Sequence, residues 1–162
     1  MDIAESRFET LLDTYAPALR RLCAAYQTDA ADQHDLFQEI ALALWEALPR
    51  FRGDASERTW LYRIAHNVAL TYSGKRRRTE SRWAPLEETH VAADAGDPRR
   101  VELLQAIQRL EAVEIRLALL YLEGLSAKEI GQVLGISEGN AAVRLTRLRQ
   151  HLTQILNPKE VL

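Results

Sequence analysis

The stretch from Asp32 to Arg78 has the sequence DQHDLFQEIALALWEALPRFRGDASERTWLYRIAHNVALTYSGKRRR, and the rest of the chain is expected to pack around it. Its first part is acidic and polar, its middle holds Pro49 and Gly53, and its last part is aromatic and ends in positive charge. Apolar residues in the first part recur at the spacing of a helix with one buried stripe. The members of this stripe are Leu36, Phe37, Ile40, Leu44 and Leu48.

Three polar residues of this helix, Asp35, Gln38 and Glu39, lie at positions i, i+3 and i+4 and therefore share one exposed side. The spacing alone leaves two interpretations open. The face is either an ordinary solvated acidic surface or a docking surface for a basic partner.

The segment PRFRGDAS is not expected to be helical, because Pro49 lacks a backbone donor and Gly53 favours a turn. Phe51 and Arg52 are therefore expected on irregular backbone. Ser56 is a suitable N-cap for the helix that follows.

That next helix carries Trp60, Tyr62, Arg63, His66 and Asn67 and runs into GKRRR. Aromatic rings stack on bases and cations hold phosphates, so this combination is typical of a surface that grips single-stranded nucleic acid. The alternative is that Trp60 and Tyr62 belong to the core. The apolar stripe of the helix is expected to consist of Leu61, Ile64, Ala65, Val68 and Leu70.

The chain of 162 residues is long enough for one ordinary domain or two small ones, and its net charge is −2. The charge alternates in blocks: residues 1–50 carry −5, residues 51–82 carry +5, residues 83–125 carry −4 and residues 126–162 carry +2. Both positive blocks coincide with helices that we expect to bind DNA, and the acidic blocks suit a protein partner.

The N-terminal segment from Ile3 to Tyr26 has helical periodicity, and Pro17 is expected to kink or divide this helix. We expect it to pack against the helices described above and assign it no chemistry. Cys23 is the only cysteine and lies in an apolar run, which predicts a buried thiol and excludes an internal disulfide. The acidic N-terminus and the lack of a long apolar run favour a cytosolic protein without a signal peptide or membrane insertion.

After Arg82 the helical periodicity fails, and WAPLEETHVAADAGDP predicts a flexible tether of roughly fifteen residues. Asp97 and Pro98 suit the N-cap and first turn of a new helix. The sequence therefore predicts an all-α protein of two small helical domains, residues 1–82 and 99–162, joined by a linker at 83–98.

The second domain is expected to begin with helices at Arg99–Leu110 and Glu114–Glu123, and Gly124 stops the second of them. Ser126 and Glu129 have the spacing of a capping box, which predicts the start of a further helix of about eight residues.

Gly135 ends this short helix, Gly131 is small where a crossing helix must come close, and Ser137 caps a longer helix. The arrangement is a helix-turn-helix whose second helix reads the major groove. The alternative is an ordinary helical hairpin with a charged outer face. The longer helix has an apolar stripe of Ala141, Leu145, Leu148, Leu152 and Ile155, with Asn140, Val143, Thr146 and Arg147 opposite and Arg144 and Arg149 at the flanks.

Three segments of the first domain resemble region 2 of bacterial RNA polymerase sigma factors of the small extracytoplasmic-function (ECF) type. They are DLFQE at Asp35–Glu39, FRGDAS at Phe51–Ser56 and TWLYRIAHN at Thr59–Asn67. The segment LYLEGLSAKEIGQVLGISEGNAAVRLTRLRQHL resembles sigma region 4. The two resemblances cover nearly the whole chain and leave no room for regions 1.1 and 3 of larger sigma factors.

The resemblance implies a chain that gives core RNA polymerase its promoter specificity, melts the −10 element through region 2 and reads the −35 element through region 4. Asp35, Leu36, Gln38 and Glu39 would dock on the clamp helices of the polymerase β′ subunit, and the β flap would be a second contact. An anti-sigma factor that covers both domains is a further expected partner. No catalytic residue, metal or cofactor is implied.

The resemblance also nominates residues that contact DNA. A base flipped out of the −10 element costs a few kcal/mol, which stacking and edge contacts offset. The pocket for that base would hold Phe51, Arg52, Gly53 and Asp54, the helix along the −10 DNA would present Trp60, Arg63 and Asn67, and Lys75, Arg76, Arg77 and Arg78 would hold the backbone. The −35 element would be met by Asn140, Arg144, Thr146, Arg147 and Arg149.

Two positions depart from the family pattern. Ala142 and Val143 stand where many members have Lys or Arg followed by Ser. Alanine cannot form the bidentate guanine contact of arginine, although it can touch a thymine methyl, so an unusual or weakly read −35 element is expected. Glu111–Val113 replace the proline often seen before the region 4 helices, and we attach no function to this change.

Two other classes of function fit parts of the sequence. His34 with Asp35 and Glu39 could ligate a metal on one helix, but no second ligand set of matching spacing, phosphate-binding glycine loop or nucleophile motif is present. A helix-turn-helix repressor would bind duplex DNA alone, whereas a sigma factor of this type is expected to bind poorly without core polymerase.

Overall fold

The structure, a computed structural model, describes residues 2–83 and 97–158, and the side chains of residues 75–83 lie outside this description. The described residues contain helices and no strand, so the all-α prediction is confirmed. The chain separates into two compact units, Met1–His90 and Val91–Leu162. Most of the predicted linker, residues 84–96, lies outside the described residues. The elements are α1 (Ile3–Tyr26), α2 (Ala30–Ala47), the 3₁₀ helix η1 (Leu48–Arg50), α3 (Glu57–Trp83), α4 (Pro98–Gln108), α5 (Ala112–Leu122), α6 (Ala127–Leu134) and α7 (Glu138–Leu156).

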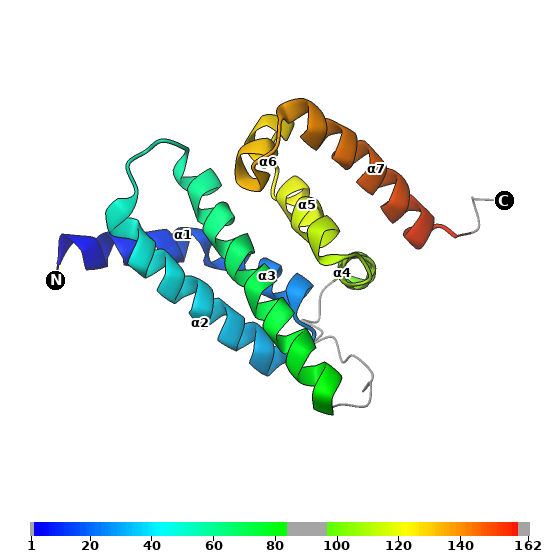
Figure 1. The fold of residues 1–162 in the computed structure, drawn as a ribbon, viewed down its shortest axis with the longest axis horizontal. Helices are drawn as coiled ribbons and strands as arrows, with labels where there is room; N and C mark the ends of the chain where they lie inside the picture. The colour runs from blue at the N-terminus through cyan, green and yellow to red at the C-terminus, as the bar shows by residue number, and fades with distance from the viewer. Residues whose placement is uncertain (1, 84–96, 159–162) are drawn as a thin grey trace. The chain divides into compact units, whose positions relative to one another are not determined.

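The first unit is a bundle of α1, α2 and α3, in which α2 and α3 lie side by side and α1 packs against both (Figure 1). Most of the stripe predicted for α2 forms its centre: Leu36, Ile40 and Leu44 have no exposed surface, and Leu48 is buried beyond them. Phe37, the other predicted member, is only half-buried. Each fully buried leucine or isoleucine contributes about 1.5–3 kcal/mol, so these residues set the face of α2 that turns outward.

Pro17 lies inside α1, and the helix runs through it as one element, so of the two predicted effects, a kink or a division, the division does not occur. A proline inside a helix costs about 3 kcal/mol, because one backbone hydrogen bond is lost. Ala18, Leu19 and Leu22 follow directly and are buried. The burial of these three side chains against the neighbouring helices is large enough to offset the cost.

The buried face of α3 is rotated by about one residue from the prediction. Tyr62 and His66 are 3% and 1% exposed, whereas Ile64 and Val68 of the predicted stripe are only half-buried. Tyr62 and His66 therefore belong to the core and not to a surface for nucleic acid. Burial of the histidine is possible because the Tyr26 hydroxyl at the end of α1 lies 3.0 Å from its Nδ1 atom.

The segment PRFRGDAS is partly helical, contrary to the prediction, because its first two residues complete η1 at Leu48–Arg50. Pro49 is tolerated there, since the first turn of a helix does not use the backbone donor that proline lacks. The rest of the segment is irregular, and Gly53 adopts the positive φ of 79° that a turn requires. Ser56 caps α3 as predicted: its hydroxyl accepts the backbone N–H of Thr59 at 3.1 Å.

The second unit contains the predicted helix-turn-helix, in which α6 and α7 are joined by a tight turn (Figure 1). The capping box is present, because the Ser126 hydroxyl accepts the Glu129 N–H and the Glu129 carboxylate accepts the Ser126 N–H, each at 3.2 Å. Gly135 ends α6 with a φ of 72°. Ser137 then caps α7 by accepting the Asn140 N–H at 3.1 Å.

Gly131 is needed for a different reason from the predicted one. A Cβ atom at this position would lie 2.7 Å from the backbone oxygen of Ile136 and 3.4 Å from backbone atoms of Ser137. The close neighbour is therefore the turn of the helix-turn-helix itself and not a crossing helix. The absence of a side chain at Gly131 allows the turn at Ile136 and Ser137 to pack directly against α6, and this packing sets the orientation of α7 relative to α6.

The helices before the helix-turn-helix begin one or two residues earlier than predicted. Asp97 caps α4 by accepting the Arg99 N–H at 3.0 Å, and Pro98 occupies the first helical position, both as predicted. Glu111 precedes α5, and its backbone N–H is accepted by the Glu114 carboxylate at 3.4 Å. The residues that stand in place of the proline thus start α5 with a capping box formed by Glu111 and Glu114.

Candidate protein and nucleic-acid interfaces

The polar face of α2 is exposed as predicted. Asp35, Gln38 and Glu39 all face solvent, while Leu36 in the same turn is completely buried. Leu36 therefore cannot itself contact a partner, and its role is to hold the turn that presents the three polar side chains. The face offers two carboxylates within one helical turn, which suits a basic partner surface.

His34 lies exposed beside this polar face. Its Nε2 atom lies 3.1 Å from the side-chain nitrogen of Gln38, one turn further along α2. Within residues 2–83 and 97–158 no group of three His, Cys, Asp or Glu side chains is placed to hold a metal ion. The hydrogen bond with His34 instead restricts the rotamer of Gln38.

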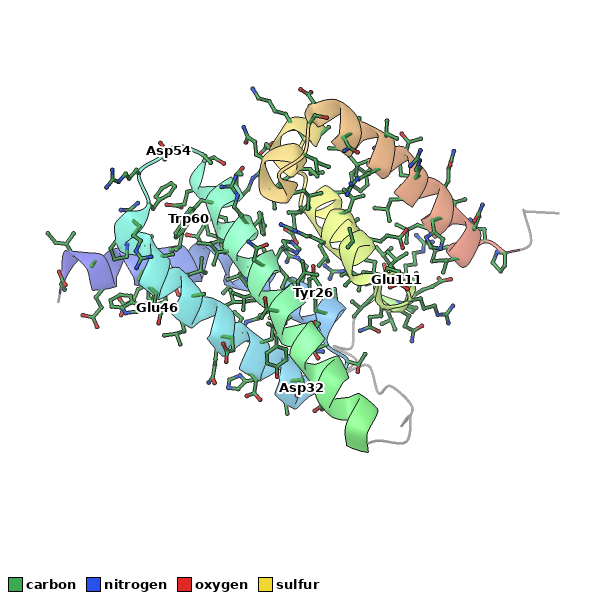
Figure 2. All side chains as sticks on the ribbon, viewed as in Figure 1. Tyr26, Asp32, Glu46, Asp54, Trp60 and Glu111 are labelled. Carbon is green, nitrogen blue, oxygen red and sulfur yellow. The ribbon has the colours of Figure 1, made fainter. Side chains whose placement is uncertain are left out.

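The loop between η1 and α3 carries the second candidate surface (Figure 2). The rings of Phe51 and Trp60 lie 4.8 Å apart between centroids at an angle of 39°, and both are half-buried. Arg52, Gly53 and Asp54 between them are exposed. The loop therefore surrounds a partly open aromatic pair with one cation and one carboxylate, the groups that can stack on a base and bond its edges.

Arg7 of α1 lies against this aromatic pair. The sequence analysis did not predict a role for Arg7. Its guanidinium carbon lies 5.7 Å from the centroid of the Phe51 ring, within the range of a cation–π contact. Arg7 is exposed, so its donors remain accessible to solvent. No local pattern in α1 marks this residue, because its meeting with Phe51 depends on how the bundle packs.

The outer face of α3 continues from Trp60. Arg63 and Asn67 follow at i+3 and i+7, lie on the same side of the helix and are exposed. The backbone of Lys75, Arg76, Arg77 and Arg78 extends α3, but their side chains lie outside the described residues. The described part of α3 thus presents one ring, one cation and one amide in a row.

The pKa of Tyr15 on α1 is raised by its surroundings beneath this surface. Tyr15 packs edge-on against Tyr62, with ring centroids 6.4 Å apart. Burial raises the pKa of Tyr15, the negative charge of Glu57 raises it further, and the positive charge of Arg58 lowers it. The first turn of α3 therefore lies close to α1, with one residue of each sign facing that tyrosine.

The exposed face of α7 has the composition predicted for a DNA-reading helix. Asn140, Val143, Arg144, Thr146 and Arg147 are exposed, on the side away from the buried Ala141, Leu145 and Leu148. Arg144 donates from Nε to the Asn140 side-chain oxygen at 3.2 Å, and the Thr146 hydroxyl donates to the Ala142 carbonyl oxygen at 3.1 Å. These contacts limit the rotamers on the face that would meet base edges.

Three contacts join α5 to the helix-turn-helix, two of them to α7 and one to α6. The Arg149 guanidinium lies 4.8 Å from the centroid of the Tyr121 ring, and His151 Nδ1 lies 3.1 Å from a Glu114 oxygen. Arg116 donates to the Val133 carbonyl oxygen at 3.0 Å, at the end of α6 where helix carbonyls lack partners within the helix. No local pattern marks Tyr121 or Arg116, because only the packed unit brings them to α7 and α6.

Comparisons with known proteins place both units in known families. Residues 11–79 match the family Sigma-70 region 2, and residues 100–152 match the family Sigma-70, region 4. The RNA polymerase sigma-H factor of Pseudomonas aeruginosa is 32% identical over 93% of this chain and 86% of its own length. The ECF RNA polymerase sigma factor SigM of Mycobacterium tuberculosis is 30% identical over 92% of this chain and 76% of its own.

A solved structure shares the fold. The sigma factor RpoE of Bartonella quintana, crystallised with the anti-sigma factor NepR, superposes with a TM-score of 0.76 over 94% of this chain and 98% of its own, at 23% identity. Among the described residues no helix is long and apolar enough to cross a membrane. The two family matches together cover most of the sequence, and the chain therefore belongs to the sigma-70 family of bacterial RNA polymerase sigma factors, within the ECF type.

Proposed function

We propose that this sigma factor docks on core RNA polymerase through the polar face of α2. Asp35, Gln38 and Glu39 would contact the clamp helices of the β′ subunit, and Leu36 would support them from the core. The observation that carries this proposal is the exposure of all three polar side chains directly above a completely buried leucine. Because the helix is anchored in the core, its backbone needs no further ordering when the face binds a partner.

The −10 element is proposed to meet the loop and α3. A base flipped out of the duplex would stack on the half-buried pair of Phe51 and Trp60, and Arg52, Gly53 and Asp54 would contact its edge and backbone. Arg63 and Asn67 would follow the same strand along α3, and Lys75, Arg76, Arg77 and Arg78 would hold phosphates. The chain would need no catalytic residue, metal or cofactor, because the polymerase supplies the chemistry.

The −35 element is proposed to meet α7, through Asn140, Arg144, Thr146, Arg147 and Arg149. Ala142 and Val143 lie on this face, and Val143 is 50% exposed. Apolar side chains at these positions favour contact with thymine methyl groups over a bidentate contact with guanine. The −35 site would therefore contain thymine where these two residues lie.

The two units are proposed to divide these tasks, with residues 1–82 serving core polymerase and the −10 element and residues 99–162 serving the −35 element and the β flap. A linker at 83–98 would let both engage one promoter. The relative from Bartonella quintana is bound by an anti-sigma factor in its crystal structure. We infer that a partner of the same kind controls this chain, and that it works in the cytosol where the polymerase is.

The docking proposal is tested by the affinity of a fluorescently labelled chain for purified core polymerase. Replacing Asp35 and Glu39 with alanine should weaken binding at least 30-fold, the effect expected for central charged contacts of an interface. Glu46→Ala is the matched control, because Glu46 is an exposed carboxylate on the same side of α2 but nearly two turns beyond Glu39, outside the Asp35–Glu39 segment. An equal loss in both variants, or none in the double variant, would contradict the proposed face.

A further inference from the structure

The last turn of α5 presents an aromatic ring at the surface of the second unit. Tyr121 is 39% exposed, and the guanidinium carbon of Arg149 on α7 lies 4.8 Å from the centroid of its ring. This distance is within the range of a cation–π contact. A contact of this kind at an exposed site adds little to the stability of a fold, so its main effect falls on the arginine side chain.

The packing of α5 against α7 does not depend on this ring. The two helices contact each other, and Leu120 of α5 and Leu148 of α7 lie in the core of the unit. The Glu114 carboxylate and the His151 ring, 3.1 Å apart, join the same two helices at another point. Removing the aromatic ring should therefore free the arginine without releasing α7.

The contact with the ring leaves the N–H groups of Arg149 available. Within residues 2–83 and 97–158 none of these groups donates to a protein acceptor. Arg144, on the same helix, instead donates from Nε to the Asn140 side-chain oxygen. Because the aromatic contact uses the charge of Arg149 and not its donors, all five N–H groups of its planar fork can serve a phosphate group.

Arg149 lies along the edge of the α7 face that is proposed to meet the −35 element. It follows Ala142 by seven residues and Thr146 by three, and all three residues are exposed. Residues at these spacings lie on the same side of a helix. A free arginine there would adopt many rotamers, and fixing it on DNA would cost conformational entropy. An arginine already held by a ring has lost part of that freedom before DNA binds.

We propose that Tyr121 is a positioning residue for recognition of the −35 element. Its ring holds the Arg149 guanidinium ready for a phosphate of the DNA backbone, so promoter affinity rises although Tyr121 itself does not touch DNA. The inference rests on the proposed contact of α7 with the −35 element and adds one residue of α5 to it. The aromatic ring is required for this role, and the tyrosine hydroxyl is not.

The test measures how tightly the complex of the full chain with core polymerase binds a fluorescent genomic duplex from which it gives a run-off transcript. Arg149→Ala should weaken binding and flatten the dependence of log K on log salt by about 0.9, the slope of one phosphate contact in B-DNA. Arg109→Ala is the matched control, because it removes an exposed arginine of the second unit that lies outside α7. Its salt slope should equal that of wild type.

Tyr121→Leu should weaken binding about two- to fivefold, the effect of losing one exposed cation–π contact, and leave the salt slope at its wild-type value. Tyr121→Phe keeps the ring and should bind as wild type does. In a chain that already carries Arg149→Ala, Tyr121→Leu should weaken binding no further. Hydrogen exchange in α7 should be the same in every variant, which confirms that the unit folds.

The variants separate this inference from the proposal on which it rests. If Arg149→Ala flattens the slope, the −35 contact stands, and wild-type binding by Tyr121→Leu or equal losses in Tyr121→Leu and Tyr121→Phe would overturn the inference. A further loss from Tyr121→Leu in the Arg149→Ala chain, or faster exchange in α7, would show a structural role and overturn it as well. If Arg149→Ala keeps the wild-type slope, the proposed phosphate contact fails and the inference fails with it.

Discussion

The two units of this sigma factor build their candidate surfaces in different ways. In the first unit the surface proposed to meet unpaired DNA joins three separated segments, represented by Arg7, Phe51 and Trp60. In the second unit the surface lies on α7 alone, from Asn140 to Arg149. The first surface therefore depends on how the helices pack against one another. The second depends on the residue at which α7 begins and on the turn that sets its orientation.

The difference predicts where each unit is most sensitive to substitution. The first should lose its surface when its core is damaged. The second should lose it when the glycines or caps of the helix-turn-helix are changed. Four substitutions test this contrast, from the largest expected effect to the smallest.

Leu44→Ala should destabilise the first unit by about 2–5 kcal/mol, because it leaves a cavity where a completely buried leucine joins α2 to the bundle. Urea denaturation followed by tryptophan fluorescence should show the loss, since every tryptophan of the chain lies at or before residue 83. Amide hydrogen exchange in α6 and α7 should stay at its wild-type rate. Faster exchange there would show that the second unit depends on the core of the first.

Gly131→Ala should destabilise the second unit by about 1–3 kcal/mol, because the new Cβ would lie 2.7 Å from the Ile136 carbonyl oxygen and the turn would have to shift. Gly139→Ala is the matched control: a Cβ there meets no atom within 4 Å, and alanine raises helix propensity by up to about 1 kcal/mol. Hydrogen exchange in α6 and α7 measures both changes. Equal exchange rates in the two variants would contradict the view that the tight turn at Gly131 stabilises the second unit.

Ser126→Ala should destabilise the second unit by about 1 kcal/mol, since the capping hydroxyl that accepts the Glu129 N–H at 3.2 Å is lost. Ser126→Asp, which keeps a capping acceptor, should restore most of the stability. The same exchange measurement applies. A loss in the aspartate variant equal to that in the alanine variant would argue against the cap.

Cys23 should make the first unit less stable above pH 9. Burial raises the pKa of its thiol from 9.0 to about 12, so the unfolded chain ionises while the folded chain does not. The stability present below pH 9 is lost as pH rises towards 12, and the loss is about 0.8 kcal/mol by pH 9.5. Urea denaturation at pH 8 and 9.5 should show a smaller pH effect in Cys23→Ala than in wild type, and equal pH effects would refute the burial argument.

Much of the second unit could be predicted from sequence because its signals are local. The Ser126–Glu129 box, Gly135 and Ser137 each fix a helix end through atoms within a few residues, and all three adopt the expected geometry. In the first unit, the bounds of α1 could also be predicted, because its apolar residues recur at helical spacing. The arrangement of side chains around the turn, including the Arg116 bond to Val133, depends on contacts between helices and could not be predicted.

The first unit was harder to predict because distant partners decide which residues are buried. His66 can lie in the core because the Tyr26 hydroxyl, forty residues earlier, meets its ring, and nothing in the sequence around α3 indicates this partner. Pro17 remains helical because the residues after it are packed. The exposed face of Asp35, Gln38 and Glu39 was predictable, since the apolar stripe of α2 alone determines it.

Run-off transcription from genomic DNA fragments tests the central claim most directly. Core polymerase would be supplied with the wild-type chain or with the Asp35→Ala and Glu39→Ala double variant. If Asp35 and Glu39 dock on core polymerase, specific transcripts should appear with the wild-type chain and be lost with the double variant. Absence of transcripts with the wild-type chain, together with tight binding of a duplex by the chain alone, would contradict it.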